Sequence, residues 1–181
     1  MELLAPSHWR TIDFISDLHL QCAETATFDA WSQYMRQTTA NAIFILGDLF
    51  EVWVGDDILD NDGFEQRCSA VINDAARRAS VFVMHGNRDF LMGARLMEQS
   101  HATLLDDPTV LTFGEQRWLL THGDALCLGG YRLLGLQGPG SQWHVAKRFF
   151  GKTAGGTRSH RPRTTHAKRA AKAQRRALCR R

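Results

Sequence analysis

Phe14-Ile15-Ser16-Asp17-Leu18-His19-Leu20 is the stretch that decides the fold. An apolar run that begins at residue 12 leads directly into Asp17 and His19, two side chains that can bind a metal ion. Residues two apart on an extended chain point to the same side, so a strand that ends in this way aims a carboxylate and an imidazole at one point beyond the sheet. Asp-x-His is common by chance, and its meaning depends on what the other strands supply.

The first 100 residues alternate between apolar strands and amphipathic helices. The periodicity predicts strands at 11–16, 42–46 and 81–84, and helices at 25–38, 62–79 and 89–99. It predicts further short strands at 102–105, 110–113 and 118–120, the last two forming a hairpin around the turn 114–116. Residues 1–10 are expected to form a loose leader. This order indicates a layered α/β fold with parallel strands.

Polar side chains follow four of the predicted strands, namely Asp17 with His19, Asp48, Asn87 and His122. Ligands of parallel sheets collect beyond the carboxyl ends of the strands, so these side chains are expected at one edge. Each has a simpler explanation alone: Asp48 after Gly47 fits a helix cap or an Asx-turn, and a single histidine is more often structural. Together they favour a hydrolytic site for manganese, iron or zinc over a structural thiolate zinc site.

Composition and charge describe a soluble chain with two unlike parts. The 181 residues are 44% hydrophobic and 23% charged, enough for one domain with a sizeable core. No run approaches the roughly 20 apolar residues of a membrane span, and residues 1–10 lack a signal-peptide core, so a cytoplasmic location is expected. Residues 1–128 hold 8 basic and 19 acidic residues, a net charge of −11, whereas residues 129–181 hold 14 basic residues and no acidic one.

The strand-end motifs resemble those of the calcineurin-like metallophosphoesterases. The matching motifs are Asp17-Leu18-His19, Gly47-Asp48, Gly86-Asn87-Arg88-Asp89 and His122-Gly123-Asp124. Longer segments, FISDLHL (14–20), ILGDLFEVWVGDD (45–57), HGNRDFLMG (85–93) and THGDALCL (121–128), are similar to the UDP-2,3-diacylglucosamine diphosphatases of that superfamily. The resemblance covers residues 11–128. It implies a four-layer αββα sandwich that hydrolyses UDP-2,3-diacylglucosamine to 2,3-diacylglucosamine 1-phosphate (lipid X) and UMP in lipid A biosynthesis.

The resemblance also implies a site with two divalent metal ions, expected to be Mn²⁺. Asp17 and His19 would bind the first ion, Asp48 would bridge both, and Asn87 with His122 would bind the second. Asp48, Asn87 and His122 are thus the expected catalytic residues. Asn87 and Arg88 are the expected substrate-binding residues, because a guanidinium group matches phosphate geometry. The family further implies a monomer, peripheral on the cytoplasmic face of the inner membrane, with no specific nucleic-acid partner.

The resemblance ends after Leu128. The family pattern continues to a Gly-His-x-His motif whose histidines complete the two metals, and residues 129–181 contain no such motif. We therefore expect a metallophosphoesterase domain over 1–128, incomplete at its C-terminal side, and an out-of-frame or disordered basic tail over 129–181. We expect the chain as written to be poorly soluble and nearly inactive, because missing strands leave a sheet edge and an apolar face open to solvent.

Two other functions remain open. Another two-metal phosphoesterase, such as a nuclease or a nucleotide phosphatase, would use the same ligands. A genuine basic tail would instead make the chain an inactive binder of nucleic acid or of acidic membrane surfaces. In that case the affinity for nucleic acid should fall steeply with salt and vanish when residues 129–181 are removed.

Overall fold

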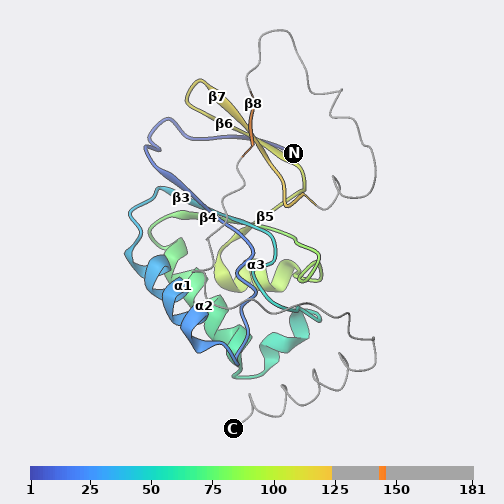
Figure 1. The fold of residues 1–181 in the computed structure, drawn as a ribbon. Helices are drawn as coiled ribbons and strands as arrows, with labels where there is room; N and C mark the ends of the chain where they lie inside the picture. Colours follow the sequence, from blue (N-terminus) through green and yellow to red (C-terminus); the bar gives the residue numbers. More distant parts are fainter. Residues whose placement is uncertain (124–142, 146–181) are drawn as a thin grey trace, which may run out of the picture.

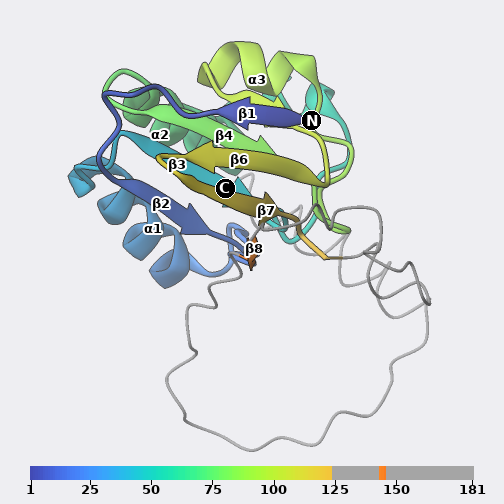
Figure 2. The same cartoon turned by 90° about the horizontal axis from the view of Figure 1, so that it is seen from above.

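The computed structural model describes residues 1–123 and 143–145, which build three stacked layers (Figure 1). The central layer is a sheet of four parallel strands in the order β2 (Ile12–Ile15), β3 (Ala42–Leu46), β4 (Ser80–Met84) and β5 (Thr103–Leu105). The helices α1 (Thr25–Gln37), α2 (Phe64–Ala76) and α3 (Ala94–Ser100) cover one face of this sheet. A second sheet covers the other face, as the view from above shows (Figure 2).

The central strand β3 is buried along its whole length because both faces of its sheet are covered. Its side chains alternate between the two neighbouring layers. Ile43 and Ile45 belong to the core against the helices, whereas Phe44 belongs to the core between the sheets. There Phe44 stacks on Phe14 of β2 and Phe82 of β4, with ring centroids 5.3 and 4.7 Å apart. Because side chains on both faces of β3 are buried, residues 42–46 form a continuous apolar run.

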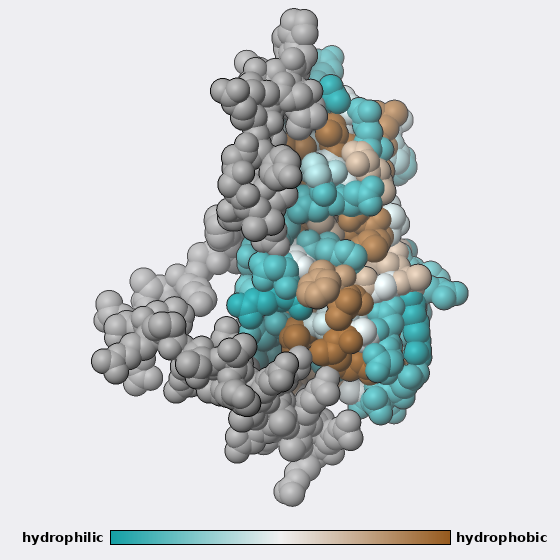
Figure 3. Space-filling model, turned by 90° about the vertical axis from the view of Figure 1, so that its right-hand side faces the viewer, coloured by the Kyte–Doolittle hydropathy of each residue, from teal (hydrophilic) through white to brown (hydrophobic). Residues whose placement is uncertain are grey.

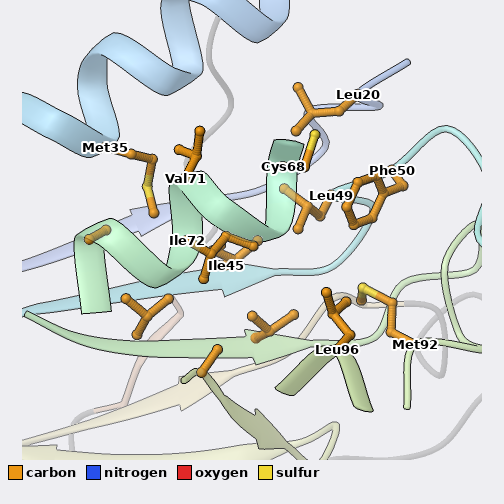
Figure 4. Close-up of a cluster of buried hydrophobic side chains, with 14 of the residues drawn as sticks. Leu20, Met35, Ile45, Leu49, Phe50, Cys68, Val71, Ile72, Met92 and Leu96 are labelled. Carbon is orange, nitrogen blue, oxygen red and sulfur yellow. The ribbon is translucent and has the colours of Figure 1, made fainter. Parts of the chain in front are cut away.

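Each helix buries one stripe of side chains against the central sheet. Met35 of α1 meets Val71 and Ile72 of α2 over Ile45 of β3, and Leu49 closes this core beside Cys68 (Figure 4). The spacings of three and four residues along α1 and α2 are those of an amphipathic helix. In the part of the chain that the structure describes, every helix is too short or too polar to cross a membrane.

The second sheet has the order β1 (Glu2–Leu4), β6 (Thr109–Phe113), β7 (Gln116–Leu120) and β8 (Trp143–Val145). Strands β6 and β7 form the predicted antiparallel hairpin. The prediction of a loose leader over residues 1–10 is wrong. Strand β1 pairs in parallel with β6, and Trp9 is buried with its ring edge-on to Phe44 and Phe82.

The start of the third helix also differs from the prediction. The helix expected over 89–99 begins at Ala94, after an irregular loop. Asp56, in the 3₁₀ helix η1 (Asp56–Asp60), accepts hydrogen bonds from the backbone N–H groups of Gly93, Arg95 and Leu96. A carboxylate on the free N–H groups of a first helical turn fixes where that helix begins. The distance in sequence between Asp56 and this helix explains why the contact was not predicted.

The predicted α/β class and its parallel sheet are confirmed. The described residues supply an α layer and two β layers of the αββα sandwich. Of the segment 129–181, only the backbone of β8 is described, where it extends the second sheet beside β7. The predicted out-of-frame or disordered tail otherwise lies outside the described residues, and the domain boundary at residue 128 stays a prediction.

Candidate metal centre

The loops that follow β2, β3 and β4 are joined by backbone hydrogen bonds at the carboxyl edge of the sheet. Asp17 N–H donates to the carbonyl of Gly47 (3.1 Å), and His19 N–H donates to the carbonyl of Asp48 (3.0 Å). From the third loop, Arg88 N–H donates to Asp48 Oδ1 (3.0 Å). Three of the predicted strand ends therefore meet, with Asp48 at the centre.

Asp17, Asp48 and His122 form one cluster, in which a ligand atom of each lies within 4.8 Å of the others. Asp48 is almost fully buried and presents one oxygen to each of two imidazoles. Its Oδ1 is 3.8 Å from His122 Nε2, and its Oδ2 is 3.8 Å from His19 Nε2. The two carboxylates and the His122 imidazole of this cluster, with the His19 imidazole beside the other oxygen of Asp48, are donors suited to a borderline divalent metal ion.

His122 reaches this cluster from the second sheet, because it follows β7. Its Nδ1 lies 2.9 Å from the carbonyl oxygen of Leu46. Since a carbonyl only accepts, Nδ1 carries the proton, and the lone pair of the neutral ring is on Nε2, which faces Asp48. The backbone N–H of His122 donates to Asp107 Oδ2 (3.3 Å). The buried ring is therefore held in the tautomer that a metal ligand requires.

The backbone is strained at three of the predicted ligands. Asp17, His19 and Asp48 have φ angles of 56°, 50° and 51°, in the left-handed region that L-residues avoid. Such a conformation costs on the order of 1–3 kcal/mol per residue and persists where the surroundings over-determine it. Glycine would remove the strain but would also remove the side chain. All three of these positions carry side chains that could bind a metal ion.

Two glycines let the loops approach closely enough to build the cluster. A Cβ atom at Gly47 would lie under 3.0 Å from His122 Nδ1, and one at Gly86 would lie under 3.0 Å from both Oδ1 and the backbone nitrogen of Asp48. Real Cβ atoms do not make such contacts. The Gly-Asp and Gly-Asn pairs of the sequence thus have a steric reason, since the glycine makes room and the next residue supplies the polar group.

Asp89 ends the motif Gly86-Asn87-Arg88-Asp89 and supports the site, a role that the sequence did not predict. It is fully buried, and its two oxygens accept hydrogen bonds from Gly86 N–H (2.8 Å) and Phe50 N–H (3.2 Å). Burial raises the pKa of this carboxyl above its ordinary value, while the backbone donors act in the opposite direction. Asp89 therefore ties the loop after β4 to the loop after β3.

Asn87 and Arg88 are exposed in the turn between Gly86 and Asp89. Arg88 Nη1 donates to Glu51 Oε1 (2.9 Å), and the other oxygen of Glu51 lies 3.4 Å from His19 Nδ1. The sequence did not single out Glu51. The signal for it was a lone charged residue in the otherwise apolar run Leu49–Val54.

Exposed apolar side chains occur on the same two loops. Val52, Phe90 and Leu91 expose between 42% and 60% of their surface, although large apolar side chains elsewhere in these loops are buried. Figure 3 shows apolar residues among polar ones on one face of the molecule. By contrast, Phe50 and Trp53 on the first of these loops both belong to the core.

Comparison with known proteins identifies a matching family and several proteins that are similar to this chain. A family model described as calcineurin-like phosphoesterase matches residues 10–158. Proteins named UDP-2,3-diacylglucosamine hydrolase are similar to this chain. The one from Ralstonia nicotianae is 46% identical over 117 residues (63% of this chain, 43% of that protein), and the one from Chromobacterium violaceum is 42% identical over 144 residues (75% and 58%). The chain spans about half the length of the curated relatives that it matches.

Proposed function

The chain belongs to the calcineurin-like phosphoesterase family, and from this we propose that its site serves the metal-dependent hydrolysis of the diphosphate bond in UDP-2,3-diacylglucosamine. The products would be 2,3-diacylglucosamine 1-phosphate and UMP. The names of the similar proteins support the substrate. The observation that carries the chemistry is the placement of Asp48, with one carboxylate oxygen toward each imidazole.

The donor set fits two divalent ions, for which we propose Mn²⁺. Asp17 and His19 would hold the first ion, Asp48 would lie between the two, and His122 with Asn87 would hold the second. A mixture of carboxylate, amide and imidazole donors suits manganese, which accepts both oxygen and nitrogen ligands. Such a pair of ions, when bound, supplies an activated water and offsets charge on the phosphate under attack.

The protein's own groups position the substrate around this point. Arg88 is exposed next to Asp48, where its planar fork matches phosphate oxygens. The buried Asp48 and His122 define the closed side of the site, so the diphosphate would enter from the side of Arg88 and Asn87. These two residues would bind the phosphate groups, and Asp48, Asn87 and His122 would act at the reacting centre.

We propose that the protein is a monomer that works at the cytoplasmic face of the inner membrane. The support is the lipid nature of the proposed substrate and the three exposed apolar side chains Val52, Phe90 and Leu91 on the loops that carry Glu51 and Arg88. An apolar rim beside a phosphate-binding residue suits a substrate with a charged diphosphate and acyl chains.

The test is release of UMP from UDP-2,3-diacylglucosamine in Mn²⁺ buffer, compared with cleavage of DNA and of simple phosphodiesters. Asp48→Asn is the reference variant, because asparagine tolerates the left-handed backbone but lacks the carboxylate charge. The expected result is a low, Mn²⁺-dependent release of UMP that this variant abolishes. Preferential cleavage of DNA or diesters would identify another phosphoesterase. Salt-sensitive nucleic-acid binding without hydrolysis would favour the basic binder, and normal turnover by a soluble monomer would contradict the predicted impairment.

A further inference from the structure

Glu51 has a fixed position beside His19. Its backbone N–H donates to the carbonyl of Leu20 (3.1 Å), and Leu20 N–H donates to the carbonyl of Leu49 (2.8 Å). Leu20 and Phe50 are both buried, so apolar packing holds the two strand-like segments together. The start of the Glu51 side chain is therefore set by the same backbone pairing that sets His19.

The carboxylate of Glu51 divides its oxygens between two partners. Oε1 accepts a hydrogen bond from Arg88 Nη1 at 2.9 Å, and Oε2 lies 3.4 Å from His19 Nδ1. The side chain is about one third exposed, so the ion pair with Arg88 is partly screened. Its role is geometric, because it turns the second oxygen of Glu51 toward the histidine.

His19 needs such a partner. Its Nε2 faces Asp48 Oδ2 at 3.8 Å, which leaves Nδ1 on the opposite side of the ring. This Nδ1 is buried and makes no hydrogen bond, and Glu51 Oε2 lies just beyond good hydrogen-bonding distance from it. A small rotation of the carboxylate would satisfy it. Histidines that bind a metal through one nitrogen usually donate the other N–H to a carboxylate or carbonyl, and His122 does so to Leu46.

We propose that Glu51 is a positioning residue for His19. It accepts the Nδ1 proton, keeps the neutral ring in the Nδ1–H tautomer, and so directs the Nε2 lone pair toward Asp48. Arg88 holds the Glu51 carboxylate in place for this purpose. The inference rests on the proposed function, since it assigns Glu51 to the ion that Asp17 and His19 would hold. The two imidazoles on either side of Asp48 are then oriented in the same way, one by a backbone carbonyl and the other by a carboxylate.

The tautomer of His19 gives a test that does not depend on activity. It is read from long-range proton–nitrogen correlations of ¹⁵N-labelled protein at about pH 8, above the ordinary imidazole pKa of about 6.5. In the full chain without metal, His19 should carry its proton on Nδ1. Glu51→Ala should shift the proton toward Nε2, and Glu51→Gln, which keeps an acceptor oxygen, should retain the original tautomer. Glu98→Gln, on the exposed face of α3, is the matched control and should change nothing.

Binding of Mn²⁺ by titration calorimetry is the second measurement on the same variants. Loss of a group that orients a metal ligand typically weakens metal binding about 10–100-fold, so Glu51→Ala should do so and Glu51→Gln should restore most of the affinity. The proposal is overturned by an Nε2–H tautomer in the wild type, or by Glu51→Ala binding Mn²⁺ as tightly as the wild type. If the Glu51 variants show both effects but the wild-type chain cleaves DNA or simple phosphodiesters in preference to UDP-2,3-diacylglucosamine, the proposed substrate is refuted and the role of Glu51 stays supported.

Discussion

Replacing Gly86 by alanine is expected to disrupt the site at its centre. The new Cβ would lie under 3.0 Å from Asp48 Oδ1 and from the Asp48 backbone nitrogen, so one of the two loops must move. Neither contact is with the end of a flexible side chain that turns away freely, because Asp48 is buried and hydrogen-bonded to Arg88 N–H. Overpacking costs about 1–3 kcal/mol, and loss of that hydrogen bond adds about 1 kcal/mol. The expected loss of unfolding free energy is therefore about 2–4 kcal/mol.

Gly63→Ala is the matched control for this substitution. Its Cβ would meet only the tip of the Glu65 side chain at 3.3 Å and the carbonyl oxygen of Asn61 at 3.7 Å, and its φ of −112° is accessible to alanine. Urea titration followed by circular dichroism measures stability, and calorimetry measures Mn²⁺ binding. Gly86→Ala should also weaken Mn²⁺ binding by at least about tenfold, since displacements near 1 Å are costly in preorganised sites. A Gly86→Ala protein as stable as Gly63→Ala, with unchanged Mn²⁺ affinity, would refute the steric argument.

Three further predictions test the supports of the fold. Asp89→Ala leaves the buried N–H groups of Gly86 and Phe50 without their acceptor, at about 1–3 kcal/mol each; a loss below about 1 kcal/mol in urea titration would contradict this. Asp56→Ala should cost about 1–2 kcal/mol by uncapping α3. Asp60→Ala removes a solvent-exposed ion pair with Arg95 and should leave the urea midpoint close to that of the wild type. Burial and the Asp13 carboxylate raise the pKa of Tyr34 above its ordinary 10.0. Because the unfolded tyrosine ionises first, stability should fall as the pH rises above about 10, and Tyr34→Phe should fall less steeply in denaturation measured across that range.

The central sheet could be predicted because its sequence signal is local. Strands such as residues 42–46 are buried on both faces, and the helices between them show one apolar stripe, so each element carries its own pattern. The strand ends then follow from the parallel order, which is why Asp17, Asp48 and Asn87 could be assigned to one edge from the amino-acid sequence alone. His122 fits the same rule only in part, because its strand belongs to the second sheet.

The supports of the site could not be predicted because their partners are distant in sequence. Strand β1 is three residues long and two of its residues are exposed, and its pairing with β6 spans more than 100 residues. Asp89 resembled the start of a helix, whereas its oxygens serve backbone groups on another loop. Glu51 was not singled out by the sequence, and only the fold places it between His19 and Arg88. A periodic pattern carries no information about which loops meet.

The strain at Asp17, His19 and Asp48 shows what holds the site in shape. Three left-handed residues at about 1–3 kcal/mol each are a large fraction of the roughly 5–15 kcal/mol by which a domain is stable. The backbone bonds between the loops, the buried Asp89 and the close approach at Gly86 offset this strain, and all of them are contacts between protein groups. Metal binding adds ligand bonds to these contacts. The strength of metal binding depends on how many ligands reach the ion. The segment that supplies the last histidines in the family pattern would therefore affect the metal affinity more than it affects the shape of this edge.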